Sequence, residues 1–231
     1  MAHKKQRDDA GLFVAEGPKI INDFLHTIPD RVKKIYATDE WAKENERGID
    51  NVPLSIISQK ELERITQLKT PNQVVAVVEK TKSKEPSIAN EVGLYLDTIQ
   101  DPGNFGTIVR IADWFGIKNI VCSEGCADLY NAKVMQASMA SMARVNVWYD
   151  VNEHWLAKQK TTIFAATLNG KSFYDVEKID KGILVIGNES RGVRPDFLQM
   201  AATEITIPKK GRAESLNAAV ATGILLSQLL K

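Results

Sequence analysis

Short apolar runs alternate with helix-patterned segments after residue 90, and this alternation restricts the possible folds more than any other feature of the chain. Runs that fit buried strands lie at 92–97, 119–122, 145–148, 162–167, 182–187 and 204–207. Helical patterns lie at 105–115, 131–142, 152–160, 194–200 and 215–230. Strands that are apolar on both faces and alternate with helices predict a mostly parallel sheet covered on both sides.

The first 80 residues show a similar alternation on a smaller scale. Strands are expected at 12–16, 32–36, 54–57 and 74–78, and helices at 18–26, at 39–46 with Asp39 as N-cap, and after Ser58, where Glu61 completes a capping box. The polar segment 81–90, which contains a proline, predicts a linker. We therefore expect an α/β fold with a small domain over residues 1–80, the linker 81–90 and a larger domain over residues 91–231.

Composition and missing motifs exclude several classes of protein. The net charge of +1 argues against strong non-specific binding of nucleic acid, although it allows a local basic face. Cys122 and Cys126 have no histidine cluster beside them, so we expect reduced core residues and no metal site. No apolar run approaches ~20 residues, and an apolar signal segment is missing, which predicts no membrane contact and a cytoplasmic location. P-loop, dinucleotide-binding and nucleophile-elbow motifs are absent.

Polar loops follow three of the expected strands, at the end of the sheet where ligands bind in open α/β folds. In the first loop, residues 97–106, Pro102 and Gly103 predict a tight turn, and Asn104 is expected to cap the next helix. Arg110 lies off the apolar stripe of that helix. On this segment alone, a solvated arginine and a structural cap are the favoured interpretation.

The second loop, residues 187–192 (GNESRG), directly follows the apolar run 182–187. Gly187 allows a ligand or another part of the backbone to approach closely, and Glu189 is not expected to be buried without a partner. A simple turn into the next helix, with Pro195 in its first turn, is the alternative.

The third loop, residues 207–217, is basic and leads into a helix that is apolar nearly all round. That pattern predicts burial in the core or in a subunit interface. Ser215 is the expected N-cap of this helix. Asn217 either satisfies backbone groups of the loop or belongs to a site, because a buried amide needs partners.

Taken together, the three loops resemble the motifs of the SpoU/TrmH family of RNA 2′-O-ribose methyltransferases. They read DPGNFGTIVRIADWFGI, IGNESRGV and IPKKGRAESLNAAVATGI, and the resemblance covers residues 91–231. Ser190 departs from it, since many members have glycine there, which leaves the shape of this loop open. The small domain, with FVAEGPKII, resembles the ribosomal-protein-L30-like substrate-binding domain that often precedes the catalytic domain.

The resemblance implies a SPOUT fold, which is a mostly parallel α/β sheet with a trefoil knot at its C-terminal end. The knot would hold S-adenosylmethionine as cofactor, and members are usually homodimers with their knot regions facing each other. Carried over residue by residue, the cofactor contacts would be Thr167, Leu168, Asn169, Gly170, Gly187, Ile207, Pro208, Ser215 and Leu216.

The resemblance also implies how the methyl group reaches a ribose 2′-hydroxyl. Arg110 would act either as an unusual base or, as we prefer, by holding the developing alkoxide and a neighbouring phosphate, because arginine rarely loses its proton. Asn104, Glu189, Ser215 and Asn217 would orient Arg110 and the ribose, or brace the knot.

A 2′-hydroxyl target implies RNA and not DNA as substrate. The small domain favours ribosomal RNA over transfer RNA, by analogy only. A transfer-RNA 2′-O-methyltransferase, an enzyme that methylates a base, and a catalytically silent RNA-binding or ribosome-assembly factor are the alternatives. The expected phosphate contacts are basic side chains from the small domain and the third loop, namely Lys19, Lys33, Lys34, Lys209, Lys210 and Arg212.

Overall fold

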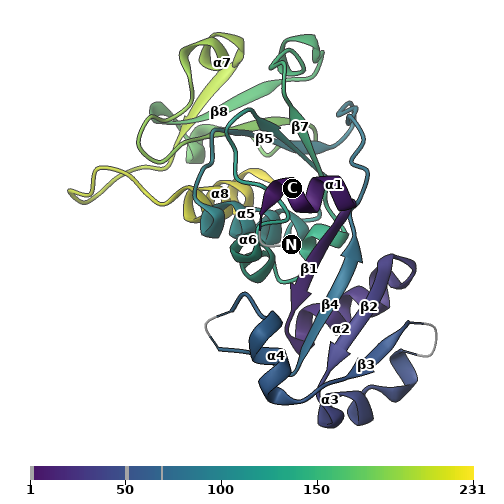
Figure 1. Ribbon diagram of the computed structural model, residues 1–231. Helices are drawn as coiled ribbons and strands as arrows, with labels where there is room; N and C mark the ends of the chain where they lie inside the picture. The colour runs from purple at the N-terminus through teal and green to yellow at the C-terminus, as the bar shows by residue number, and fades with distance from the viewer. Residues whose placement is uncertain (1–2, 50–51, 69) are drawn as a thin grey trace.

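A computed structural model describes residues 3–49, 52–68 and 70–231, which form two sheets (Figure 1). The smaller sheet has the order β1-β4-β2-β3, built from β1 (Leu12–Glu16), β4 (Val74–Glu79), β2 (Val32–Ala37) and β3 (Leu54–Ile56). β4 pairs antiparallel with both β1 and β2, whereas β2 and β3 are parallel. The four strands expected in this part of the chain are confirmed.

The helices that follow strands of the small sheet include α2 (Pro18–Thr27), α3 (Asp39–Glu44) and α4 (Gln59–Ile65). The apolar stripe of α2 is buried, and the capping box of α4 forms as predicted between Ser58 and Glu61. The N-cap of α3 is Thr38, whose hydroxyl accepts from Trp41, and Asp39 is the first helical residue. The prediction of Asp39 as cap was one position too late, since both residue types can fill this role.

The larger sheet has six strands in the order β10-β8-β9-β5-β6-β7, and every neighbouring pair is parallel. This confirms the predicted parallel sheet. Its strands are β5 (Val92–Asp97), β6 (Asn119–Ser123), β7 (Asn146–Asp150), β8 (Ile163–Ser172), β9 (Gly182–Gly187) and β10 (Thr203–Thr206).

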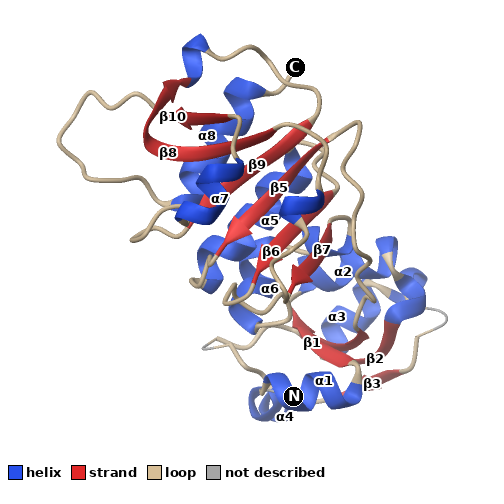
Figure 2. Cartoon of the chain, turned by 90° about the horizontal axis from the view of Figure 1, so that it is seen from above, coloured by secondary structure: helices blue, strands red, loops and turns tan. Residues whose placement is uncertain are grey.

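Helices cover both faces of this sheet, as the side-chain alternation of β5 shows. Leu94 and Leu96 pack in the apolar cluster that includes residues of α5 (Pro102–Trp114), α6 (Ala132–Ser138) and α8 (Ala218–Leu229), while Tyr95 packs in a second cluster with Phe197 of α7 (Pro195–Met200). Figure 2 shows α7 on the side of the sheet opposite to α5 and α6. Burial on both faces explains the continuous apolar runs of the sequence.

Three helix predictions fail in their extent. The segment 152–160 holds only a short 3-10 helix at Leu156–Lys158. The helix expected at 131–142 ends at Ser138, because Met139 and Ala140 adopt left-handed backbone angles before a 3-10 turn at Ser141–Ala143. The last helix begins at Ala218 and not at residue 215.

Further 3-10 turns lie at Pro29–Arg31, Glu46–Gly48 and Phe173–Asp175.

The two sheets are tied together by buried and half-buried polar contacts. The N-terminal helix α1 (Lys4–Ala10) carries the buried Arg7, whose Nη2 lies 2.6 Å from Asp128 of the larger part. Gln136 of α6 donates a 2.9 Å hydrogen bond to the carbonyl of Glu16 at the end of β1. The small sheet is therefore docked on the side of α6, as Figure 1 shows.

The predicted linker is itself packed against the larger sheet. Its Ile88 is buried, and the indole nitrogen of Trp155 donates a 3.0 Å hydrogen bond to the carbonyl of Pro86. Cys122 is buried, Cys126 is partly buried, and both are free thiols. In the part of the chain that the structure describes, no helix is long and apolar enough to cross a membrane. The trefoil knot stays a prediction from the resemblance.

Candidate active site

Three chain segments meet at the carboxyl ends of β5 and β9, two neighbouring strands at the centre of the sheet. Asp97 and Gly187, the last residues of these strands, are register partners. The first and second loops of the sequence therefore start side by side, and the third loop leads into α8, which packs beside α5. Polar side chains separated by more than a hundred residues in sequence are brought together here.

A chain of side-chain hydrogen bonds joins the three loops. Asn217 donates from Nδ2 to Oδ1 of Asn104 at 2.7 Å, and Asn104 in turn donates from its own Nδ2 to Oε1 of Glu189. The Oδ1 of Asn217 accepts from the backbone N–H groups of Ala219 and Val220. Asn217 therefore satisfies backbone donors, which lie in the first turn of α8, and its amide also contacts Asn104. Its membership of a functional site stays a prediction.

Two helix caps differ from the sequence predictions. Asp101 caps α5, and its carboxylate accepts from the backbone N–H of Asn104 at 2.7 Å. Because Asp101 fills the cap, the side chain of Asn104 is released for contacts with the other two loops. At α8 the cap is Asn217 and not Ser215, which is exposed in the preceding loop.

The backbone of the second loop folds back tightly over Gly187. A Cβ at this position would lie 2.2 Å from the carbonyl carbon of Gly192 and the nitrogen of Val193, so only glycine fits. Of the two close neighbours expected for Gly187, a ligand or another part of the backbone, the structure shows the backbone. Asn188 holds the loop from within, since its Oδ1 accepts from Ser190 at 2.9 Å while its Nδ2 donates to the carbonyl of Thr98 at 2.9 Å.

A cavity of about 640 Å³ lies beside the hydrogen-bonded cluster, within the range of small-molecule sites. Glu189 and eight of the nine predicted cofactor residues line it: Thr167, Leu168, Asn169, Gly187, Ile207, Pro208, Ser215 and Leu216. The ninth, Gly170, packs against the backbone of β10, where a Cβ would lie 2.5 Å from the carbonyl carbon of Glu204.

The cavity has the chemistry that S-adenosylmethionine requires. The Oγ1 of Thr167 is buried and has no hydrogen-bond partner among the described residues, so the cavity offers a polar atom that a ligand can satisfy. Leu198 and Leu225 supply apolar contact, and the carboxylates of Glu189 and Glu204 suit a positively charged sulfonium. The residues that line the cavity therefore fit the cofactor. Three of them, Leu198, Leu225 and Glu204, were not predicted as cofactor contacts from the sequence.

Arg110 does not line the cavity. It is exposed on α5, two turns along the helix from Asn104. Trp114, one further turn along, has 85% of its surface exposed. Residues at i and i+4 share a face of a helix, so Arg110 and Trp114 mark an exposed face of α5.

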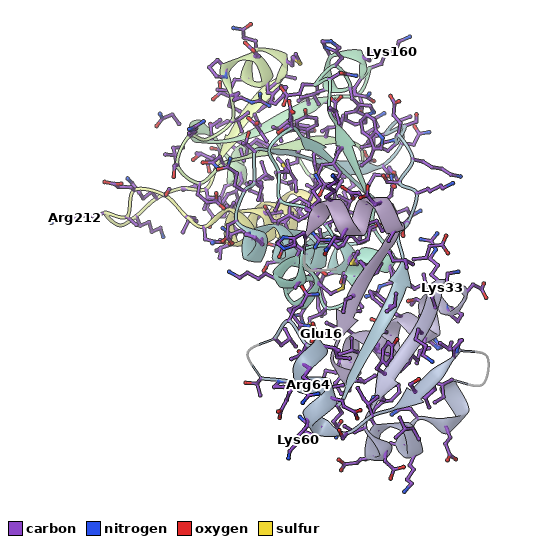
Figure 3. All side chains as sticks on the ribbon, in the orientation of Figure 1. Glu16, Lys33, Lys60, Arg64, Lys160 and Arg212 are labelled. Atoms are coloured by element: carbon purple, nitrogen blue, oxygen red, sulfur yellow. The ribbon has the colours of Figure 1, made fainter. Side chains whose placement is uncertain are left out.

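The basic residues predicted for RNA fall into two groups. Lys209 and Lys210 line the cavity, and Arg212 lies at the tip of the loop that projects from the larger part (Figure 3). Lys33 lies on the opposite side of the molecule from Arg212 in Figure 3, where its Nζ is 2.7 Å from a carboxylate oxygen of Glu79. Lys19 is exposed at the start of α2, and the Nζ of Lys34 lies 5.6 Å from the ring centre of Tyr36.

Comparison with protein families gives two matches along the chain. Residues 91–227 match the model of the SpoU rRNA methylase family. Residues 1–76 match the MRM3-like substrate-binding domain. The first match spans more than half of the chain and contains all three loops that meet at the cavity.

Individual relatives agree with these matches. The 23S rRNA (guanosine-2′-O)-methyltransferase RlmP of Bacillus subtilis is 32% identical over 98% of this chain and 91% of its own length. A TrmH-family structure from Porphyromonas gingivalis superposes with a TM-score of 0.86 and 31% identity over 99% of this chain and 93% of its own. An rRNA methyltransferase from Sinorhizobium meliloti, solved with S-adenosylmethionine bound, gives a TM-score of 0.84 and 27% identity over 99% and 90%.

Proposed function

Because the chain belongs to the SpoU rRNA methylase family, we propose that its substrate is ribosomal RNA, of which it methylates one ribose 2′-hydroxyl at the cavity described above. The chain is an S-adenosylmethionine-dependent RNA 2′-O-methyltransferase. The observation that carries the site assignment is the chain of hydrogen bonds Asn217–Asn104–Glu189 beside a cavity that fits the cofactor.

The reaction is an in-line displacement, in which the ribose oxygen would form a bond to the methyl carbon, the carbon–sulfur bond would break with its electron pair left on sulfur, and the hydroxyl proton would pass to solvent water. Bound S-adenosylmethionine supplies the electrophilic methyl group. The protein contributes position, since a correctly oriented pair of reactants reacts far faster than a free one. Thr167 and the backbone of residues 187, 207 and 216 would hold the donor, and Asn104 with Glu189 would orient the ribose.

Arg110 is proposed to act on the developing alkoxide and an adjacent RNA phosphate. Its exposed position on α5 supports contact with a bound polynucleotide, and a guanidinium can hold two oxygens at once. Lys209, Lys210 and Arg212 would hold the RNA backbone next to the cavity, and residues 1–80 would add the contacts that select the RNA. We place the reaction in the cytoplasm.

A homodimer through the C-terminal region is the proposed assembly. α5 and α8 pack against each other, and a Cβ at Gly223 would be in ordinary van der Waals contact, at 3.6 Å, with the side chain of Ile111. Beside this contact, Trp114 and Val220 are 85% and 50% exposed, which is unusual for large apolar side chains at the ends of two packed helices. Sedimentation of Val220→Glu tests the assembly: the variant should be monomeric, whereas Ile56→Glu, at an exposed apolar position of the small sheet, should stay dimeric. A monomeric parent protein would contradict this proposal.

The substrate is tested by incubating the purified protein with labelled S-adenosylmethionine and either ribosomal or transfer RNA. Label in ribosomal RNA that resists alkali as a dinucleotide supports ribose methylation of that RNA. Label in transfer RNA alone would favour the transfer-RNA enzyme, and label in a free base would favour base methylation. A protein that releases no heat on titration with S-adenosylmethionine would be the silent binding factor.

A further inference from the structure

A buried carboxylate lies directly behind the second loop and is not part of the proposed reaction. Asp97, the last residue of β5, has a side chain that is only 1% exposed, and an unpaired charge at that depth would be strongly unfavourable. Its partner is Arg194, the N-cap residue of α7, which lies 97 residues away in sequence. The Nε of Arg194 donates to Oδ1 of Asp97 at 2.7 Å, and the backbone N–H of Arg194 donates to Oδ2 at 2.8 Å.

The same arginine reaches a second carboxylate. Its Nη1 and Nη2 each lie 2.8 Å from one oxygen of Glu153, which follows β7. Glu153 has a left-handed backbone (φ 53°) and also accepts from the backbone N–H of Glu124 at 3.1 Å. Arg194 thus links the ends of β5 and β7 to the start of α7.

Asp97 holds both ends of the second loop. Gly187, where the loop begins, is the register partner of Asp97, and Arg194, just beyond the last loop residue, is bonded to its carboxylate. Asp97 also accepts from the hydroxyl of Thr98 at 2.8 Å. Thr98 has a left-handed backbone (φ 58°), rare for a β-branched residue, and its carbonyl accepts from Asn188 inside the loop.

These contacts converge on the backbone that carries Glu189. Residues 188–193 line the cavity, and Glu189 is the member of the hydrogen-bonded chain that comes from this loop. We propose that Asp97 and Arg194 are positioning residues, whose ion pair holds the second loop so that Glu189 meets Asn104 in the geometry required for methyl transfer. The proposal rests on the proposed function and concerns residues that do not themselves touch the substrate.

Asp97→Asn is the primary test because it keeps the shape and removes the charge. We expect kcat to fall about 100-fold, as for other small displacements of reacting groups, while the Kd for S-adenosylmethionine changes much less. Asp180→Asn is the matched control, because Asp180 makes an exposed ion pair with Lys231 far from the loop, and its kcat should equal that of the parent. Arg194→Lys keeps the charge but cannot contact both carboxylates as the guanidinium does. Its kcat should lie between those of Asp97→Asn and Asp180→Asn, and it replaces Asp97→Asn as the test if that variant does not fold.

Amide hydrogen exchange separates this proposal from the proposed function. In Asp97→Asn the N–H of Gly192, bonded to the carbonyl of Asn188 at 2.8 Å, should exchange faster, while amides within β9 stay protected. An unchanged exchange rate together with an unchanged kcat overturns the proposal. A uniform rise in exchange over the whole sheet, with kcat falling only as the folded fraction falls, also overturns it. A parent protein that leaves every ribose of ribosomal RNA unmethylated overturns the proposed function, whereas the exchange result still decides whether Asp97 holds the loop.

Discussion

The side chain of Asn217 donates a 2.7 Å hydrogen bond to the side chain of Asn104, although 113 residues of sequence separate them. Asn104 in turn donates to Glu189, so one amide connects all three loops. In each asparagine the amide nitrogen donates and the amide oxygen accepts a hydrogen bond. Replacing either group leaves a neighbouring residue without its hydrogen-bond partner.

Asn104→Asp is expected to disrupt this cluster with almost no change in volume. The new carboxylate would face Glu189 without a hydrogen to donate, and two carboxylates so close repel each other. We expect kcat to fall by about 100-fold through misplacement of the reacting groups, with the fold unchanged by circular dichroism. Asn45→Asp provides a control, because the side chain of Asn45 donates to the carbonyl of Trp41 within the small part of the molecule. Full activity of Asn104→Asp would remove Asn104 from the site.

Arg110→Ala is expected to separate cofactor binding from turnover. Arg110 lies outside the cavity lining, so calorimetric titration should give an unchanged affinity for S-adenosylmethionine. Removal of a group that stabilises developing charge typically lowers the rate by roughly 10²–10³-fold. Arg110→Lys should recover only part of this loss, because an ammonium does not make the forked contact. Near-normal turnover of Arg110→Ala would contradict the assigned role.

Gly187→Ala is expected to weaken cofactor binding at least tenfold, because its Cβ would displace the backbone of residues 192–193 by which the loop closes over the cavity. Overpacking of this kind typically costs about 1–3 kcal/mol. Gly211→Ala is a closely matched control, since Gly211 also lines the cavity and a Cβ there would meet nothing within 4 Å. Calorimetric titration of both variants with S-adenosylmethionine gives the comparison, and equal affinities would show that the tight turn at Gly187 does not shape the cavity.

Charge removal in the third loop is expected to weaken RNA binding in a salt-dependent manner. A variant with alanine at Lys209, Lys210 and Arg212 should bind ribosomal RNA less tightly, and the slope of log K against log salt should decrease by roughly 0.7 for each lost phosphate contact. The paired change of Lys33 and Lys34 to alanine should have a smaller effect, because Lys33 is already bound to Glu79 on the other side of the molecule. The reverse order of effects, measured by fluorescence anisotropy, would assign the main RNA surface to the small sheet.

Glu153→Gln is expected to lower the free energy of unfolding near neutral pH, and to have less effect in acid. The hydrogen bonds from Arg194 hold the pKa of the Glu153 carboxyl below its ordinary value of 4.5. A carboxyl with a lowered pKa in the folded state stabilises the fold above its unfolded pKa and loses this contribution as pH falls through the folded pKa. The difference in free energy of unfolding between parent and variant should be constant from pH 6 to 7 and shrink below about pH 4.5. A difference that grows on acidification, measured by urea unfolding, would contradict this sign.

The amino-acid sequence by itself determined the α/β class, the parallel sheet and the positions of the three polar loops. These features depend on local patterns: apolar runs that must be buried on both faces, and turn residues that must follow them. The capping box at Ser58 belongs to the same group, since both partners lie within one helical turn. The resemblance of the three loops to known motifs also indicates the family from the sequence alone.

Only the tertiary structure decided which polar residues share a contact. Asp101 takes the helix cap expected of Asn104, and Asn217 takes the one expected of Ser215, because either residue type can cap and the choice depends on what else each side chain can reach. The pairing of Asp97 with Arg194 has no local pattern at all, since nothing near either residue in sequence specifies the other. The order of the parallel strands in the sheet determines which distant residues come into contact. That order depends on long-range packing of the whole chain.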